Sequence, residues 1–116
     1  MHNYRELKIW QKAIDLSEDI YKLVSNFPAD EKFGLTSQLK RASVSVASNI
    51  AEGTSRRTAV DFNRFLSMSL GSLFEIETQL IIAQRIKLIS NETCEIYKTK
   101  ITELIKMIMA FKNHIK

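Results

Sequence analysis

Hydrophobic residues in this chain recur at alternating spacings of three and four over four separate stretches. The last stretch shows the pattern without a break, in Cys94, Tyr97, Ile101, Leu104, Ile108, Phe111 and Ile115. An α-helix turns by about 100° per residue, so these residues share one face, as in helices that pack side by side in bundles. Only one proline and three glycines interrupt the chain, which favours long helices over a many-stranded β fold.

Turn and capping residues divide this periodic pattern into four helices. The Phe27-Pro28 pair separates the first two, because proline disfavours helix at the residue before it. Thr58 begins a capping-box pattern with aspartate at its fourth position, and Ser90 can cap the last helix. The helices are predicted over residues 4–26, 35–52, 58–86 and 90–114 of one all-α domain that spans residues 1–116.

The first predicted helix carries two hydrophobic stripes. Its second stripe consists of Leu7, Trp10, Ile14, Tyr21 and Val24. Together the stripes cover roughly 200° of the helix surface, more than the usual single apolar face. Two neighbouring helices could bury much of that arc, but a contact between subunits would use it more fully.

Groups suited to catalysis or metal binding are scarce. The two histidines, His2 and His114, lie near the chain ends, and no Glu-x-x-His motif of a di-iron bundle is present. The single cysteine, Cys94, lies on the apolar face of the fourth helix, which indicates a small hydrophobe in the core. We therefore expect no catalytic residues, no metal, no cofactor and no enzymatic activity.

The N-terminal residues lack an apolar signal segment, and no run of 18 apolar residues occurs. These features predict a cytoplasmic protein without a membrane partner.

The net charge of +4 is unevenly distributed, because residues 40–116 hold twelve Lys or Arg against seven Asp or Glu. This excess fits either a solvated lysine-rich face or an anionic partner. The candidate nucleic-acid contacts are Lys40, Arg41, Arg56, Arg57 and Arg64.

Glu52 stands at the end of the second predicted helix, where the helix dipole disfavours a negative charge. A polar cluster of Asn49, Glu52 and nearby arginines would offset this cost, and backbone amides of the third helix could also point towards Glu52. Gly53 is expected to end the helix in the left-handed conformation. The cluster could only fix the turn, or Glu52 could orient arginines for bidentate phosphate binding. Both interpretations stay open.

Several segments together resemble a small bacterial four-helix-bundle family associated with intervening sequences in 23S rRNA genes. They are residues 7–13 (LKIWQKA), 27–35 (FPADEKFGL), 38–42 (QLKRA), 45–53 (SVASNIAEG), 64–66 (RFL) and 71–77 (GSLFEIE). The resemblance implies an antiparallel up-down bundle and ring-like homo-oligomers, with five subunits as the implied number. The family is similar to the accessory protein of diversity-generating retroelements, a basic pentameric bundle that associates with reverse transcriptase and nucleic acid.

Two functions follow as hypotheses. The first is a non-catalytic homo-oligomer that binds RNA or DNA, with RNA favoured, mainly through phosphates and therefore in a salt-dependent manner. The second is a scaffold that docks a partner protein such as a reverse transcriptase, suggested by the wide apolar arc of the first helix.

Overall fold

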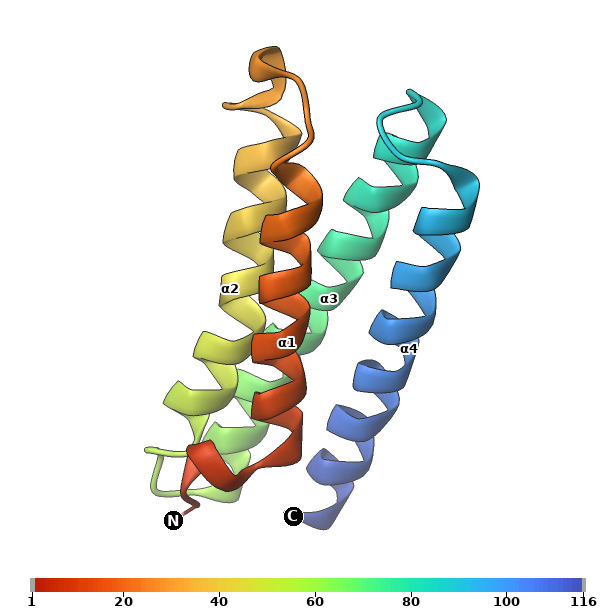
Figure 1. Cartoon of the computed structure of the whole chain (residues 1–116). Helices are drawn as coiled ribbons and strands as arrows, with labels where there is room; N and C mark the ends of the chain where they lie inside the picture. Colours follow the sequence, from red (N-terminus) through yellow and green to blue (C-terminus); the bar gives the residue numbers. More distant parts are fainter. Residues whose placement is uncertain (1, 116) are drawn as a thin grey trace.

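The computed structural model describes residues 2–115, and these form an all-α bundle (Figure 1). Its four helices are α1 (Lys8–Val24), α2 (Leu35–Gly53), α3 (Ala59–Arg85) and α4 (Asn91–His114). Short 3-10 turns, η1 (Tyr4–Glu6) and η2 (Ala29–Glu31), precede α1 and α2. The predicted fold class and number of helices are therefore confirmed. The α-helix begins at Lys8 instead of residue 4, because Asn3 caps the separate η1 turn through a bond from the Arg5 amide.

Successive helices run in opposite directions, so the connections between them lie at the two ends of the bundle (Figure 1). The α2–α3 turn and both chain termini lie at one end, which we call the terminal end. The α1–α2 and α3–α4 connections lie at the other. This up-down arrangement places the start of α3 next to the end of α2, and it decides which basic residues can meet.

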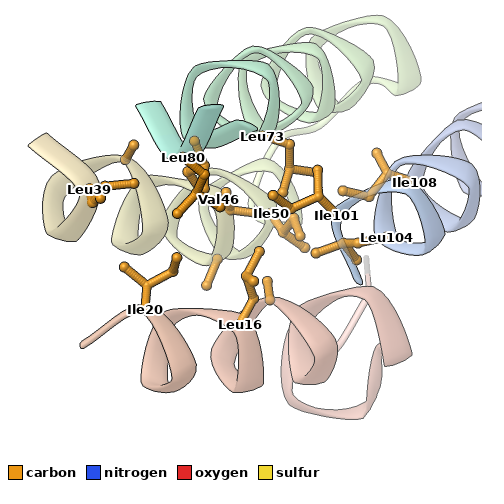
Figure 2. Close-up of a cluster of buried hydrophobic side chains, with 14 of the residues drawn as sticks. Leu16, Ile20, Leu39, Val46, Ile50, Leu73, Leu80, Ile101, Leu104 and Ile108 are labelled. Carbon is orange, nitrogen blue, oxygen red and sulfur yellow. The ribbon is translucent and has the colours of Figure 1, made fainter. Parts of the chain in front are cut away.

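The core is formed by the predicted stripes of all four helices (Figure 2). The central side chains are fully buried: Ile20, Leu39, Val46, Ile50, Leu66, Leu73, Ile76, Leu80, Ile101 and Ile108. The second stripe of α1 is only partly covered, since Ile14 and Tyr21 each keep 43% of their surface exposed. The bundle alone therefore does not bury the whole apolar arc of α1.

Helix α3 has the length and composition of a membrane span, with a mean hydropathy of 1.2 over an 18-residue window. Half of that window is buried inside the bundle, and the core helix of a soluble protein has the same character. The apolar composition of α3 thus has a structural use here, because its buried face contributes Leu66, Leu73, Ile76 and Leu80 to the core.

Small residues allow α2 and α3 to approach closely. The buried Ser69 hydroxyl donates to the backbone carbonyl of Val46 at 2.8 Å, and the Ser72 hydroxyl donates to the Ser45 hydroxyl at 3.0 Å. Such bonds across a helix pair require short side chains on both partners. The serines and alanines of α2 therefore serve a packing role.

The prediction of a left-handed Gly53 is wrong. Among the described glycines none has a positive φ, and Gly53 is the last helical residue of α2, followed by Thr54 in the right-handed helical region. A Cβ atom at Gly53 would lie 2.8 Å from Cδ1 of Phe62 and 3.0 Å from Cβ of Phe65. Glycine is required here because α3 begins against the backbone of α2, and not because of its conformational freedom.

The predicted helix caps are present. The Thr58 hydroxyl accepts a bond from the Asp61 amide at 3.1 Å, and the Ser90 hydroxyl accepts one from the Thr93 amide at 3.0 Å. The reciprocal half of the capping box is replaced, since the Asp61 carboxylate pairs with Arg64. The Thr58 cap therefore fixes the start of α3, and the Asp61 carboxylate of its first turn pairs with Arg64 one turn later.

Candidate nucleic-acid interface

Two arginines, one from the α2–α3 turn and one from the start of α3, contact the same aromatic ring. The guanidinium carbon of Arg56 lies 4.4 Å from the centroid of the Phe65 ring, and that of Arg64 lies 4.8 Å from it. Phe65 is buried, so its ring is a rigid support for both cations. Arg57 follows Arg56 directly and is exposed. Two arginines eight residues apart thus share one platform at the terminal end.

The acidic neighbours of these arginines neutralise them only weakly. Arg56 Nη2 lies 3.7 Å from Glu52 Oε1, and Arg64 Nη2 lies 3.2 Å from Asp61 Oδ1. All four side chains are at least one-third exposed, and ion pairs of this kind contribute less than about 1 kcal/mol. Within residues 2–115, no carboxylate lies within 4.0 Å of Arg57. The arginines therefore keep their capacity to bind an anion.

Glu52 lies beside Arg56, one helical turn away, and this pair offsets the unfavourable position of the carboxylate at the end of α2. In the part of the chain that the structure describes, no backbone amide of α3 donates to Glu52. Of the two partners expected for Glu52, the structure therefore shows the arginine and not the first amides of α3.

Asn49 is not part of the arginine cluster, which corrects the predicted grouping. Its Nδ2 donates to the backbone carbonyl of Ser45 at 2.9 Å and to the Ser45 hydroxyl at 3.0 Å. The Ser45 hydroxyl also accepts from Ser72 of α3. A short amide side chain reaches the residue one turn earlier, so Asn49 belongs to the serine contact between α2 and α3. The polar residues near the end of α2 form two separate groups.

Lys40 and Arg41 lie apart from the other basic candidates. Arg41 precedes Gly53 by twelve helical residues, which is about 18 Å along α2. Lys40 Nζ lies 5.0 Å from the centroid of the Tyr21 ring of α1, and Arg41 is exposed. The five candidate residues thus do not form one site: three gather at the terminal end, and two lie towards the opposite end of the bundle.

Sequence reasoning missed the aromatic side chains that organise the terminal end. The ring of Phe62 lies 5.7 Å from that of Phe111 and 5.5 Å from the imidazole of His2, measured between centroids. Lys112 of α4 donates to the Asn63 carbonyl at 3.1 Å and to the Ser67 hydroxyl at 2.7 Å. The signal in the sequence is the pair Phe62 and Phe65, whose spacing by itself predicts two residues on the core face of the third helix.

The buried Cys94 has the character of a core residue. Burial raises the pKa of its thiol, because the charged thiolate loses its hydration there. Its Sγ lies 3.8 Å from the Leu80 carbonyl. Among residues 2–115, no group of three or more His, Cys, Asp or Glu side chains is placed to hold a metal ion.

Residues 5–110 match the model of the family described as 23S rRNA-intervening sequence protein. The chain belongs to this family. Its fold is also similar to the crystal structure of a protein of unknown function from the S23 ribosomal protein family of Bacteroides thetaiotaomicron. That match has a TM-score of 0.79 and 24% sequence identity, and it covers 90% of this chain and 97% of the other. At this identity the likeness shows the fold alone. None of the curated proteins matches the chain.

Membership of the 23S rRNA intervening sequence protein family confirms the resemblance inferred from the sequence. One segment of that resemblance, residues 45–53, forms the half of α2 that packs on α3 through Ser45 and Gly53. In this member of the family, the segment therefore sets the distance between α2 and α3 and the position of the arginine-bearing turn.

Proposed function

We propose that this protein is a non-catalytic homo-oligomer that binds RNA through its phosphates. The observation that carries the proposal is the gathering of Arg56, Arg57 and Arg64 at the terminal end, with Phe65 as a support and only exposed acidic partners. Guanidinium groups pair with phosphate oxygens in a fixed bidentate geometry, so arginines held on a rigid ring suit this task. The reference to 23S rRNA in the description of the family supports RNA as the class of nucleic acid.

Phosphate-directed binding predicts a measurable salt dependence. If three arginines of a subunit each neutralise one phosphate of a single strand, the slope of log K against log salt is about −2 per subunit. We expect a structured 23S rRNA fragment without terminal phosphates to bind at low salt, as measured by mobility shift and fluorescence anisotropy. The double substitution Arg56→Ala/Arg57→Ala should flatten the slope by about 1.4 and weaken binding across RNA sequences.

The matched control is Arg85→Ala, because Arg85 is also exposed but lies in the last turn of α3 at the opposite end of the bundle. It should leave the slope unchanged. Absence of binding at about 50 mM salt would refute the proposal. Binding that the double substitution leaves intact would show that the terminal end is not the interface.

Self-association is the second part of the proposal. A groove of about 310 Å³ on the α1–α2 face is lined by apolar side chains that include Trp10, Ile14 and Val44, and the last two are more than 40% exposed. Helix α3 exposes further apolar residues, among them Met68, Phe74 and Ile82. Apolar surfaces on different helices of one subunit suit the head-to-tail contacts of a ring, for which the family resemblance implies five subunits.

Sedimentation velocity tests this part directly. The wild-type protein should sediment as an oligomer, and Ile14→Asp should dissociate it while its helical circular dichroism is kept, since Ile14 is 43% exposed in the single chain. Ile96→Asp is the control, because Ile96 is 51% exposed on α4, away from the groove. A wild-type protein that sediments as a single chain at micromolar concentration would rule out the oligomer.

The groove also favours the alternative of a scaffold that docks a partner protein such as a reverse transcriptase. The two functions differ in what holds the partner. A purified partner that stays bound after nuclease treatment, and is lost with Ile14→Asp but not with Arg56→Ala/Arg57→Ala, would favour the scaffold over RNA binding.

A further inference from the structure

A small recess lies at the terminal end, where the N-terminal residues, the α2–α3 turn and the last residues of the described chain meet. Its volume is about 170 Å³. The polar residues that line it are Arg56, Arg57, His2, Thr54 and Thr58. Among residues 2–115 no Asp or Glu lines the recess, whereas two arginines do.

The two arginines have donors that the described protein does not use. The Nε of Arg56 is buried and has no acceptor, and the distance of 3.7 Å to Glu52 is too long for a hydrogen bond. Arg57 has no carboxylate within 4.0 Å. An anion in the recess would pair with the exposed Arg57 guanidinium, which has no carboxylate partner among residues 2–115.

The surroundings of the recess reinforce its positive potential. The 27-residue helix α3 begins at its wall, and the N-terminal end of a helix carries a partial positive charge. The Asp61 carboxylate of the first turn, which could cancel this charge, pairs with Arg64 and does not line the recess. Beside these charges, the rings of His2 and Phe62 lie 5.5 Å apart and form an aromatic wall.

We propose that this recess binds the terminal phosphate monoester of an RNA strand, an inference that rests on the proposed RNA-binding function. A phosphate monoester has a second pKa of about 6 and is largely a dianion at neutral pH, whereas each internal phosphodiester carries one negative charge. The two lining arginines, of which Arg56 has the exposed Glu52 beside it at 3.7 Å and Arg57 has no carboxylate partner among residues 2–115, match the dianion. The small volume admits a phosphate at a strand end more readily than a continuous strand, and the His2–Phe62 wall offers the terminal nucleoside an aromatic surface.

Three oligoribonucleotides of one sequence test the inference: one with a 5′-phosphate, one with a 3′-phosphate, and one with neither. Each carries the same internal fluorophore, and dissociation constants are measured by anisotropy. One phosphorylated end should bind about tenfold more tightly than the strand with two hydroxyl ends, which corresponds to one charge-assisted contact. Arg57→Ala should abolish this preference, and because Arg57 is exposed the variant should fold. Arg85→Ala, at the other end of α3, should keep it.

The outcomes separate this inference from the proposed function. Equal binding of the three strands by the wild-type protein would overturn the terminal-phosphate site and leave RNA binding intact. A preference that persists in Arg57→Ala would also overturn it, because the phosphate would then be held elsewhere. Failure of all three strands and of the rRNA fragment to bind would overturn both proposals.

Discussion

Replacing Gly53 with alanine is expected to destabilise the bundle by up to about 2 kcal/mol. The added methyl group would lie 2.8 Å from Cδ1 of Phe62 and 3.0 Å from Cβ of Phe65. The Cβ atom of Phe65 is fixed to the backbone, so α3 must move away from α2 to relieve the contact. Overpacking of this kind costs about 1–3 kcal/mol, which exceeds the gain of about 1 kcal/mol from replacing a helical glycine with alanine.

Gly71 provides the matched control, since it also lies inside a helix but a Cβ atom there meets nothing within 4 Å. Gly71→Ala should therefore stabilise the protein by about 1 kcal/mol, a change of opposite sign for the same substitution. Urea denaturation at one fixed protein concentration measures both, and roughly 4 °C in Tm corresponds to each kcal/mol for a chain of this size. Equal changes at the two positions would contradict the role of close packing at Gly53.

The substitution Ile76→Ala should have the largest effect of those considered, a loss of about 3–4 kcal/mol. Ile76 is fully buried in the middle of α3, where it belongs to the core formed by all four helices. Truncation removes buried methyl groups and leaves a cavity that the surrounding helices fill only in part. Because domains of this kind are stable by about 5–15 kcal/mol, the loss should be plain in urea denaturation and in thermal unfolding.

Ile82→Ala is the corresponding control on the same helix. Ile82 is 46% exposed in the single chain, so its truncation should cost less than about 1 kcal/mol if that face is solvated. A larger loss that grows with protein concentration would instead place Ile82 in a contact between subunits. If Ile76→Ala proved as mild as Ile82→Ala, the assignment of the core face of α3 would be incorrect.

Much of the fold could be predicted from the residues, because helical periodicity and capping are local properties. The stripe of α4 and the caps at Thr58 and Ser90 follow from spacings within a few residues. The main local error, the left-handed Gly53, arose because two physical demands select glycine. One demand is a positive φ, which a glycine at the end of a predicted helix suggests from the sequence alone. The other is a lack of space for a Cβ atom, and at Gly53 this depends on how Phe62 and Phe65 of α3 pack on α2.

The candidate site was predictable only as a set of basic residues. Arg56 and Arg57 are adjacent in the sequence, but the proximity of Arg56 to Arg64 depends on Phe65, whose ring both guanidiniums contact. Asn49 was grouped with Glu52 because the two are three residues apart, yet its amide bonds to Ser45 on the preceding turn. A short polar side chain can reach several hydrogen-bond partners within one helical turn. Which partner it bonds depends on small differences in distance that sequence spacing does not resolve.

The amino-acid sequence by itself determined four amphipathic helices, their buried faces and an excess of positive charge after residue 39, since these depend on composition and on period along one chain. Only the tertiary structure decided that Lys40 and Arg41 lie far from the three arginines at positions 56, 57 and 64. It also decided that a recess, which no Asp or Glu of residues 2–115 lines, opens beside the α2–α3 turn. The physical reason is that charge and hydrophobicity are carried by individual residues, whereas a binding site requires distances between residues that only the packing of helices sets.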